Sequence, residues 1–527
     1  MNKAVKTNIL NRIKGKGIDR SVISCFFLAA YFILHEFNAN YGLVSLSTAS
    51  GLLMKYMLIV IIVLFLALLI FREYKKTVFL TFITLFFFFF FGAIHDWIKA
   101  NVSNFFFRSH TFLFSFIAVF LIWVSLFIRK RQLFVARSIK FFSFFSAILF
   151  LWETADLLIN VINKNEKKNI LFEQTPVAKS TVAMQNKPDI FYIVLDSYAG
   201  FNCLSENFGF TDSVFETFLK AKGFYVVYKS KSNYPLTPFS IASTLSMQYI
   251  SIPGYDNIAV PAKNMLQGAV SVSEATVPVL LDTNGYKIYN YSIFDFAHYP
   301  ALNKNYFSST SKRLIDEQTM EGRFRRYLLW NFTVPTTKQG KIIVTKSIRK
   351  WQSEYVDDFT NRNFDGLVKA ATAPDTSPKF VYCHVMLPHD PYFLRRDGSF
   401  WPDSLLYDKS HPKDKFIEQT IYANHRVIKV VDDLMKNRKR PYVIILQGDH
   451  GYRDFENKSE LQKIFQNLSA FYFSDQDYTS LYDSMSNVNT FRVVLNKYLA
   501  TQYPLLPDST VYIKDADFNF ERSGGKK

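Results

Sequence analysis

The stretch KPDIFYIVLDSY, residues Lys187–Tyr198, decides the fold of the second half of this chain. A run of β-branched and aromatic residues without polar alternation is typical of a strand that is buried on both faces of a parallel sheet. The run ends in a single acid, Asp196, and open α/β sheets bind their ligands at the carboxyl ends of such strands. The stretch therefore predicts a sheet edge that carries a functional site.

The composition predicts two physically different halves. The chain has 527 residues, 55 of them Phe, and 49% are hydrophobic, which exceeds what one ordinary soluble domain contains. Of the formal charge of +18, residues 1–165 contribute 18 Lys and Arg against 6 Asp and Glu. Because most of the excess lies in the apolar half, a basic surface for nucleic acid is the minor interpretation, and no nucleic-acid partner is expected.

The first half predicts an α-helical membrane domain of five helices. Each of five apolar segments is long enough to cross about 30 Å of hydrocarbon. The segments are approximately Ser21–Phe37, Leu52–Phe71, Val78–Trp97, Thr111–Ile128 and Ile139–Ile162. Asp96, Glu153 and Asp156 lie near segment ends, where they either line a lipid pathway or are simply solvated at the interface.

Basic residues predict the orientation of these helices. Lys and Arg gather in the amino-terminal arm and in the second and fourth connections, whereas the first and third connections hold few. Since positive residues favour the inner side, the amino terminus is predicted to be cytoplasmic. After five crossings the carboxyl half lies outside, so we expect a multi-pass protein of the cell (inner) membrane with a periplasmic or extracellular second half.

Three regions follow from this pattern: a transmembrane domain over 1–162, a juxtamembrane linker over 163–187, and an outer domain over 188–527. From Pro188 onward, short buried-looking strands alternate with helices, which predicts an α/β domain with a central, mostly parallel sheet. Residues 309–375 have weak periodicity and are interpreted as an insertion or a helical cover. A bridge between Cys203 and Cys383 is conceivable on the outer side, but buried free thiols are preferred.

Reactive side chains gather at further strand ends and at one helix start. Thr237 precedes a proline that suits the first turn of a helix, so its hydroxyl lies at a positive helix terminus. His384 and His389 flank the end of a second buried strand. Asp449 and His450 leave a third one between two glycines. Each signal alone has an ordinary structural explanation as a turn or a cap, and it is their joint occurrence that points to chemistry.

The combination suits a single divalent cation. Asp196, Thr237, Asp449 and His450 together offer oxygen ligands and one imidazole, which favours Zn²⁺ or Mn²⁺. A threonine hydroxyl is a poor nucleophile until a metal and a helix dipole favour its alkoxide. His384 and His389 would then act on the non-bridging oxygens or the leaving group of a phosphate.

With these residues in place, the chain resembles the alkaline-phosphatase and sulfatase superfamily. Within it, the chain is most similar to the membrane-anchored phosphoethanolamine transferases and lipoteichoic-acid synthases, which have five amino-terminal spans and an outer catalytic domain. The resemblance maps the strand acid to Asp196, where the transferases usually carry Glu. It maps the nucleophile to Thr237, the Asp-His metal pair to Asp449 and His450, and a pair of histidines to His384 and His389.

Two departures narrow the resemblance. Sulfatases carry a Cys or Ser in a C/S-x-P-x-R block that matures to formylglycine, and this sequence has no such block. Two-metal members supply a D-x-x-x-H pattern and a later histidine, but Asp390 is followed four residues on by Leu394, and no histidine follows His450. A site with one metal ion is therefore expected.

The resemblance implies a metal-dependent transferase. A head-group phosphodiester of a membrane phospholipid, phosphoethanolamine or glycerol phosphate, would pass through a phosphothreonine at Thr237 to a hydroxyl of an envelope glycan or lipid. A membrane-anchored hydrolase of phosphate or sulfate esters is the alternative. An inactive scaffold would require degraded ligands, and all the ligand types are present. Arg395 and Arg396 either pair with phosphate or are solvated loop charges.

Overall fold

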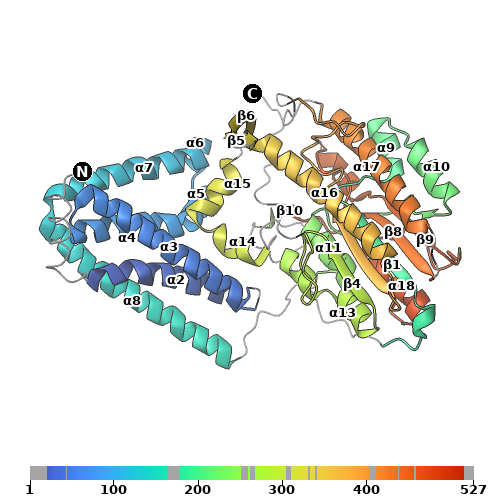
Figure 1. Ribbon diagram of the computed structural model, residues 1–527, viewed down its shortest axis with the longest axis horizontal. Helices are drawn as coiled ribbons and strands as arrows, with labels where there is room; N and C mark the ends of the chain where they lie inside the picture. The colour runs from blue at the N-terminus through green and yellow to red at the C-terminus, as the bar shows by residue number, and fades with distance from the viewer. Residues whose placement is uncertain are drawn as a thin grey trace. The chain divides into compact units, whose positions relative to one another are not determined.

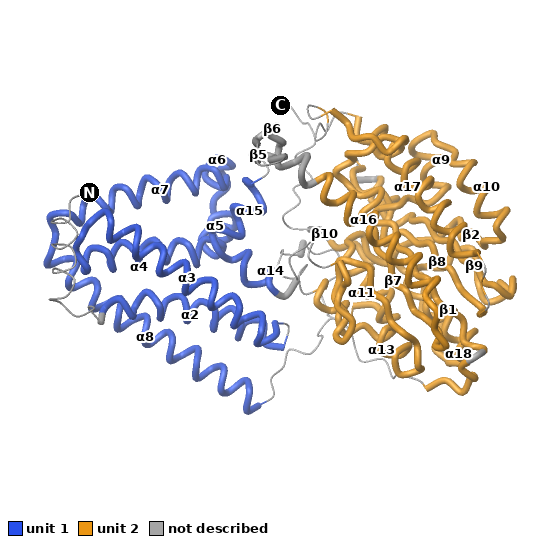
Figure 2. The backbone as a smooth tube through the Cα atoms, viewed as in Figure 1, with its two compact units in different colours: residues 1–168, 311–332 blue, residues 169–310, 333–527 orange. Residues whose placement is uncertain are grey.

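The computed structural model describes residues 20–42, 44–163, 179–250, 259–260, 268–303, 310–329, 333–338, 341–402, 405, 411–436, 438, 440–455 and 458–515. The chain forms two compact units, coloured separately in Figure 2. Unit 1 contains residues 1–168 and 311–332, and unit 2 contains residues 169–310 and 333–527. The predicted linker over 163–187 falls largely outside the described residues.

Unit 1 is helical and strongly apolar (Figure 1). Its helices are α2 (Ile23–Ala39), α3 (Leu46–Phe71), α4 (Tyr74–Phe89), α5 (Phe91–Asn101), α6 (Phe105–Arg108), α7 (His110–Phe127) and α8 (Gln132–Ile162). Among the described residues, three helical segments are long and apolar enough to cross a membrane: α3, the segment His110–Lys130 that begins with α7, and α8. These segments indicate a membrane protein, and α8 with its 31 residues exceeds the bilayer core in length.

The expected count of five membrane helices is not confirmed. The predicted third span is broken at Phe90 into α4 and α5, which are bent by 56° and count as a fourth crossing only if the pair forms one span. The predicted first span becomes α2, whose 17 residues make it a shorter apolar helix. Apolar composition predicted the segments, but it does not report where a helix bends or ends.

The buried acid Glu153 links two helices of unit 1. Its carboxylate accepts a hydrogen bond from Asn38 Nδ2 at 2.8 Å and lies 2.8 Å from Nδ1 of His35. Because unpaired polar groups are costly in an apolar helix bundle, this contact ties α2 to α8. In this structure, therefore, Glu153 contributes to helix packing.

Residues 311–332 return from the second half of the sequence to unit 1. This segment contains α14 (Thr310–Asp316) and α15 (Met320–Tyr327). Asp316 accepts hydrogen bonds from Lys55 Nζ at 3.1 Å and from the buried Tyr56 hydroxyl at 2.5 Å, and Arg323 pairs with Asp96 at 2.8 Å. Part of the region interpreted as an insertion or cover thus packs on the membrane helices.

Unit 2 is built on a six-stranded sheet in the order β2-β9-β8-β1-β7-β4. Strands β4, β7, β1 and β8 are mutually parallel, and β9 runs antiparallel to β8 and β2. The strands are β1 (Asp189–Leu195), β2 (Tyr225–Val226), β4 (Lys287–Tyr291), β7 (Lys379–Val385), β8 (Tyr442–Gly448) and β9 (Ser469–Phe473). Two small two-stranded sheets are β3 (Ala259–Val260) with β10 (Lys514–Asp515), and β5 (Thr333–Lys338) with β6 (Lys341–Ser347).

Helices cover both faces of the sheet (Figure 1). The helices of unit 2 are α9 (Phe201–Phe208), α10 (Ser213–Ala221), α11 (Thr237–Ser246), α13 (Thr276–Thr283), α16 (Ile348–Thr372), α17 (Pro412–Met435) and α18 (Thr490–Leu499). Alternate residues of β1 enter different cores: Phe191 joins residues of α9, α10, α16 and α17, whereas Tyr192 joins residues of α11, α13 and α18. Burial on both faces explains why β1 reads as a continuous apolar run.

The structure contains no disulfide among its cysteines, because Cys25, Cys203 and Cys383 are all free and buried. Burial raises the pKa of the Cys203 thiol to about 12 and raises that of Cys383 as well. Since the thiolate is the reactive form, we expect the native protein to react very slowly with a thiol reagent at pH 8. After denaturation without a reductant, the same reagent should titrate all three thiols of the chain. A count of one would instead demonstrate a Cys203–Cys383 bridge.

Candidate metal and phosphate site

Three parallel strands bring the predicted residues to one edge of the sheet. In the register of the sheet, Val194 of β1 lies opposite His384 of β7, and Leu195 lies opposite Gly448 of β8. Asp196 and Asp449 therefore follow neighbouring strands at the same level. Asp196 and Asp449 are more than 250 residues apart in the sequence, and the parallel pairing of β1 with β8 brings them together.

The turn after β1 joins the two acids. Ser197 has a positive φ of 64°, and its backbone N–H donates to Asp449 Oδ1 at 2.9 Å. Asp196 is held through its own backbone N–H, which donates to the carbonyl of Val385 at 3.1 Å. The strained turn thus places both carboxylates next to each other, and such strain is typical of functional sites.

The two glycines around the Asp-His pair allow close approach of neighbouring backbone. A Cβ atom on Gly448 would lie 2.6 Å from the carbonyl oxygen of Tyr198, and one on Gly451 would lie 2.4 Å from that of Gln466. Both distances are too short for any larger residue, so the G-D-H-G sequence is required by packing around the site.

Asp196, His384 and Asp449 form a compact group of ligand atoms. One ligand atom from each lies within 4.8 Å of the others, and all three residues are buried. His384 Nε2 is 3.4 Å from Asp196 Oδ2, yet Nε2 of His384 and Oδ2 of Asp449 have no hydrogen-bond partner. Buried polar atoms without partners are costly, and a divalent cation between two carboxylates and an imidazole would satisfy them. The residues present therefore fit a metal ion.

His450 and Thr237 border the same group. His450 Nε2 is 3.4 Å from Asp449 Oδ2 and 3.8 Å from Asp196 Oδ1. Thr237 Oγ1 lies 3.3 Å from the same nitrogen of His450, at the first residue of α11. The predicted ligand set of Asp196, Thr237, Asp449 and His450 is thus brought together, and His384, which we assigned to the reaction, has its nitrogen in the group as well.

Hydrogen bonds fix the orientation of both buried imidazoles. Nδ1 of His384 lies 2.9 Å from the Tyr382 hydroxyl, and Nδ1 of His450 lies 2.8 Å from the carbonyl oxygen of Gly451. When Nδ1 carries the proton, as the carbonyl contact requires for His450, the lone pair of Nε2 faces the acids. Such outer hydrogen bonds orient histidines for metal binding.

The electrostatics of the site follow from burial and opposite charges. Burial opposes ionisation of Asp196, but His389 and His384 outweigh it and hold the pKa of this carboxyl far below its ordinary value. Burial lowers the pKa of His450, more than Asp449 and Asp196 raise it. A charged carboxylate and a neutral imidazole are the protonation states that bind metal ions.

His389 lies at the open side of the group. Its Nε2 is 3.8 Å from Asp196 Oδ1, and its Nδ1 faces the carbonyl oxygen of Asp390. Burial opposes the charged imidazolium, but the carboxylates of Asp196 and Asp390 outweigh it and raise the pKa of His389. The histidine predicted to act on a phosphate thus borders the acids while its side chain stays partly exposed.

Of the two interpretations of Arg395 and Arg396, the structure agrees with loop charges that lie away from the acids. Arg395 stacks over Trp401, and Arg396 pairs with Glu418, so neither contacts the acids. Instead Arg453 donates to His389 Nε2 at 2.9 Å. The available signal was its position three residues after His450, on the loop that leaves β8.

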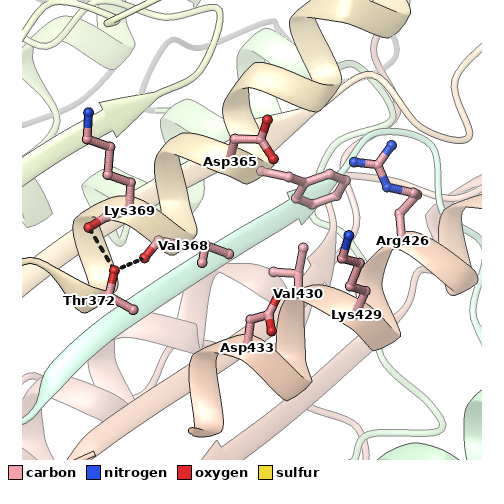
Figure 3. A pocket seen from close by; sticks show the side chains of 9 residues that line it. Asp365, Val368, Lys369, Thr372, Arg426, Lys429, Val430 and Asp433 are labelled. Carbon is pink, nitrogen blue, oxygen red and sulfur yellow. Dashed lines mark hydrogen bonds between the residues drawn. The ribbon is translucent and has the colours of Figure 1, made fainter. Parts of the chain in front are cut away.

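A separate hollow lies on a helical face of unit 2. It has a volume of about 370 Å³ and lies between α16 and α17, with Lys369, Arg426 and Lys429 among its lining side chains (Figure 3). These parts of the two helices lead into the amino-terminal ends of β7 and β8, whereas the acids follow the carboxyl ends. The hollow is therefore not the site of the acids.

The mixed α/β sheet and the group of acids and histidines at its carboxyl edge agree with the expected resemblance to the alkaline-phosphatase and sulfatase superfamily. The profile of the Sulfatase family matches residues 188–497, more than half of the chain. The chain therefore belongs to the Sulfatase family. A search of curated proteins finds no significant match.

Several solved structures show a similar fold. The chain is 12% identical to the periplasmic domain of EptC from Escherichia coli in complex with Zn, with a TM-score of 0.38 over 66% of this chain and 97% of that one. The C-terminal periplasmic domain of the phosphoethanolamine transferase EptC from Campylobacter jejuni is 12% identical, with a TM-score of 0.33 over 59% of this chain and 89% of that domain. The integral membrane lipooligosaccharide phosphoethanolamine transferase EptA from Neisseria meningitidis is 10% identical, with a TM-score of 0.39 over 93% of this chain and 96% of that one.

The metal fit predicts a specific effect on thermal stability. Saturating Zn²⁺ or Mn²⁺ at about 1,000 times its Kd should stabilise the full-length protein by roughly 4 kcal/mol. Asp449→Asn should abolish most of this gain. Because the substitution removes one of two adjacent buried carboxylates, the metal-free variant should be no less stable than the metal-free parent. Melting curves with and without metal measure both effects.

Asp454→Asn is the matched control, since Asp454 lies on the same loop and accepts a hydrogen bond from the Tyr392 hydroxyl at 3.2 Å. It should keep the full metal-induced rise in Tm. An equal rise in Asp449→Asn and in the parent would rule out Asp449 as a ligand.

Proposed function

We propose that the protein is a metal-dependent transferase of the cell envelope. It moves a phospholipid head-group phosphodiester, phosphoethanolamine or glycerol phosphate, through a phosphothreonine to a hydroxyl of an envelope glycan or lipid. The observation that carries this proposal is the position of the Thr237 hydroxyl, 3.3 Å from His450 Nε2 at the border of the acidic group. A hydroxyl in that position is placed to act as a nucleophile.

The start of α11 supports the role of Thr237. Pro238 occupies the first turn, and the side chain of Thr237 is nearly buried beside the amino-terminal end of the helix. Positive helix ends favour negative charge, which stabilises an alkoxide or a phosphate oxygen there. Ser240, one turn along the helix, donates a hydrogen bond to the backbone carbonyl of Asp449. The nucleophile and the acid are thus held by the same helix.

The proposed reaction has two displacements. In the first, a bond forms between Thr237 Oγ1 and phosphorus while the bond to the diacylglycerol oxygen breaks, and diacylglycerol leaves with a proton. In the second, a bond forms between the oxygen of an acceptor hydroxyl and phosphorus while the bond to Thr237 Oγ1 breaks, and the proton of the acceptor hydroxyl restores the hydroxyl of Thr237. A divalent ion held by Asp196, Asp449 and the neighbouring ligands, Zn²⁺ or Mn²⁺, would act as a Lewis acid and lower the pKa of the hydroxyl.

The side chains around the acids have distinct tasks in this scheme. His384, bound to the Tyr382 hydroxyl, has a fixed ring whose Nε2 faces Asp196. His389 lies at the partly exposed side, and because its Nε2 accepts a hydrogen bond from Arg453, it can give a proton to the leaving oxygen only after this nitrogen is released and protonated. The buried side of the site thus holds charge, and the open side admits substrate.

The membrane helices support a lipid donor. Anchoring a catalytic domain at the bilayer raises the effective concentration of phospholipid head groups at its site. The proposed topology, with a cytoplasmic amino terminus and a periplasmic or extracellular second half, agrees with the contacts of 311–332. This segment binds Lys55 and Tyr56 of α3 and Asp96 of α5, all at helix regions predicted to face outward.

A hydrolase of phosphate or sulfate esters is the second candidate, and membership of the Sulfatase family favours it. It would share the metal and Thr237 but release the group to water. Purified full-length protein incubated with labelled phosphatidylethanolamine and envelope glycan separates the two. Label in the glycan supports transfer, and label found only in free head-group phosphate supports hydrolysis.

Thr237 gives the most direct test. With labelled phospholipid and no acceptor, mass spectrometry should find a head-group phosphodiester on Thr237. Thr237→Ala should lower turnover by roughly 10³-fold or more, because the covalent route is lost. Thr237→Ser keeps a hydroxyl and should retain part of the activity.

Thr244→Ala serves as a control, since the Thr244 hydroxyl lies on the same helix and donates a hydrogen bond to the carbonyl of Ser240 at 2.8 Å. Its turnover should stay within a few-fold of the parent. Undiminished processing of the phospholipid by Thr237→Ala would overturn the assignment of the nucleophile.

A further inference from the structure

Arg453 places a cationic side chain at the open side of the site. Its Nη2 donates to His389 Nε2 at 2.9 Å and lies 3.6 Å from Asp390 Oδ1. His389 in turn lies 3.8 Å from Asp196 Oδ1. The guanidinium is thus two contacts away from the acids that fit a metal ion.

Most donors of this guanidinium are available to a ligand. Arginine has five N–H donors, and within the described residues Arg453 has contacts only through Nη2, to His389 and Asp390. Its side chain is 25% exposed and lies in contact with His389. A planar fork of this kind suits the paired oxygens of a phosphate or a carboxylate.

The charges of the site indicate a role for the Arg453 guanidinium. The two carboxylates Asp196 and Asp449 match the charge of one divalent ion, so a bound phosphodiester brings a negative charge that this ion alone does not offset. Burial opposes the charged form of Arg453, but Asp390 and Asp196 outweigh it and raise the pKa of its guanidinium, so it stays cationic. In a partly buried site a fixed cation of this kind stabilises charge that develops on phosphate oxygens.

Resting on the function proposed above, we propose that Arg453 is the phosphate-binding residue of this site and donates to non-bridging oxygens of the transferred group. Asp390 and His389 hold the guanidinium in position. Because the guanidinium already occupies the space beside these two residues, they do not form a second metal site. The protein thus works with one divalent ion and one arginine.

Binding of inorganic phosphate to the full-length, Zn²⁺-loaded protein tests this proposal without requiring turnover. Arg453→Gln should weaken phosphate binding by roughly 10- to 100-fold, as expected for loss of a charge-assisted, bidentate contact. Arg453→Lys keeps the charge but loses the fork, so an intermediate loss of about 10-fold is expected. Zinc content should be one ion per chain in the parent and in both variants, at unchanged Zn²⁺ affinity.

Arg396→Gln is the matched control, because Arg396 lies on a neighbouring loop and pairs with Glu418 away from the acids. Its phosphate affinity should equal that of the parent. Unchanged phosphate binding in Arg453→Gln, or two zinc ions per chain in the parent, would overturn the proposal. If the Gln variant fails to fold, unchanged binding in Arg453→Lys overturns it equally.

The outcome also separates this proposal from the proposed transferase. Weakened phosphate binding in the Arg453 variants, combined with no phosphodiester on Thr237 in the parent, would remove the transferase mechanism and leave Arg453 as the phosphate ligand. Full phosphate affinity in the Arg453 variants, combined with a phosphodiester on Thr237 in the parent, would remove Arg453 as the phosphate ligand and leave the transferase mechanism in place.

Discussion

The burial of two carboxylates, Asp196 and Asp449, at one sheet edge is the constraint on which the site depends. An unpaired buried carboxylate is costly, and two adjacent ones repel each other. In the part of the chain that the structure describes, their ion-pair partners are histidines: His384, His389 and His450 for Asp196, and His450 for Asp449. The strained turn at Ser197 and the two close glycines keep the acids in this unfavourable arrangement, which a divalent ion would relieve.

The elements with the clearest sequence signals were predictable, because a strand that is buried on both faces requires a continuous run of apolar residues, and this run is visible in the sequence. The buried strand predicted before Asp196 is β1 (Asp189–Leu195), and the alternation of strands and helices predicted from Pro188 onward forms the α/β domain. The ends of parallel strands meet at one sheet edge, so the approach of Asp196 to Asp449 also followed from the sequence. The pairing pattern of the strands does not report which side chains at that edge turn toward the acids, and for this reason the sequence did not single out Arg453.

The membrane half shows a different limit. Apolar composition marks which residues avoid water, but a bent pair such as α4 and α5 is as apolar as a straight helix. The contacts of 311–332 were equally hidden, because Asp316 and Arg323 resemble ordinary surface charges until Tyr56 and Asp96 are found opposite them. Polar residues that pair across a long sequence interval carry no local signal.

The short side chain at position 196 fits the position of His384. His384 lies inside β7, opposite Val194, and not on the loop that follows, yet its Nε2 reaches to 3.4 Å from Asp196 Oδ2. A glutamate at this position would carry its carboxylate about 1.5 Å further from the backbone. This displacement is large compared with the 4.8 Å within which the ligand atoms of Asp196, His384 and Asp449 lie. Asp196 and the histidine within the strand therefore belong together: the shorter acid keeps the group close to the sheet edge, at the depth that the nitrogen of His384 can reach.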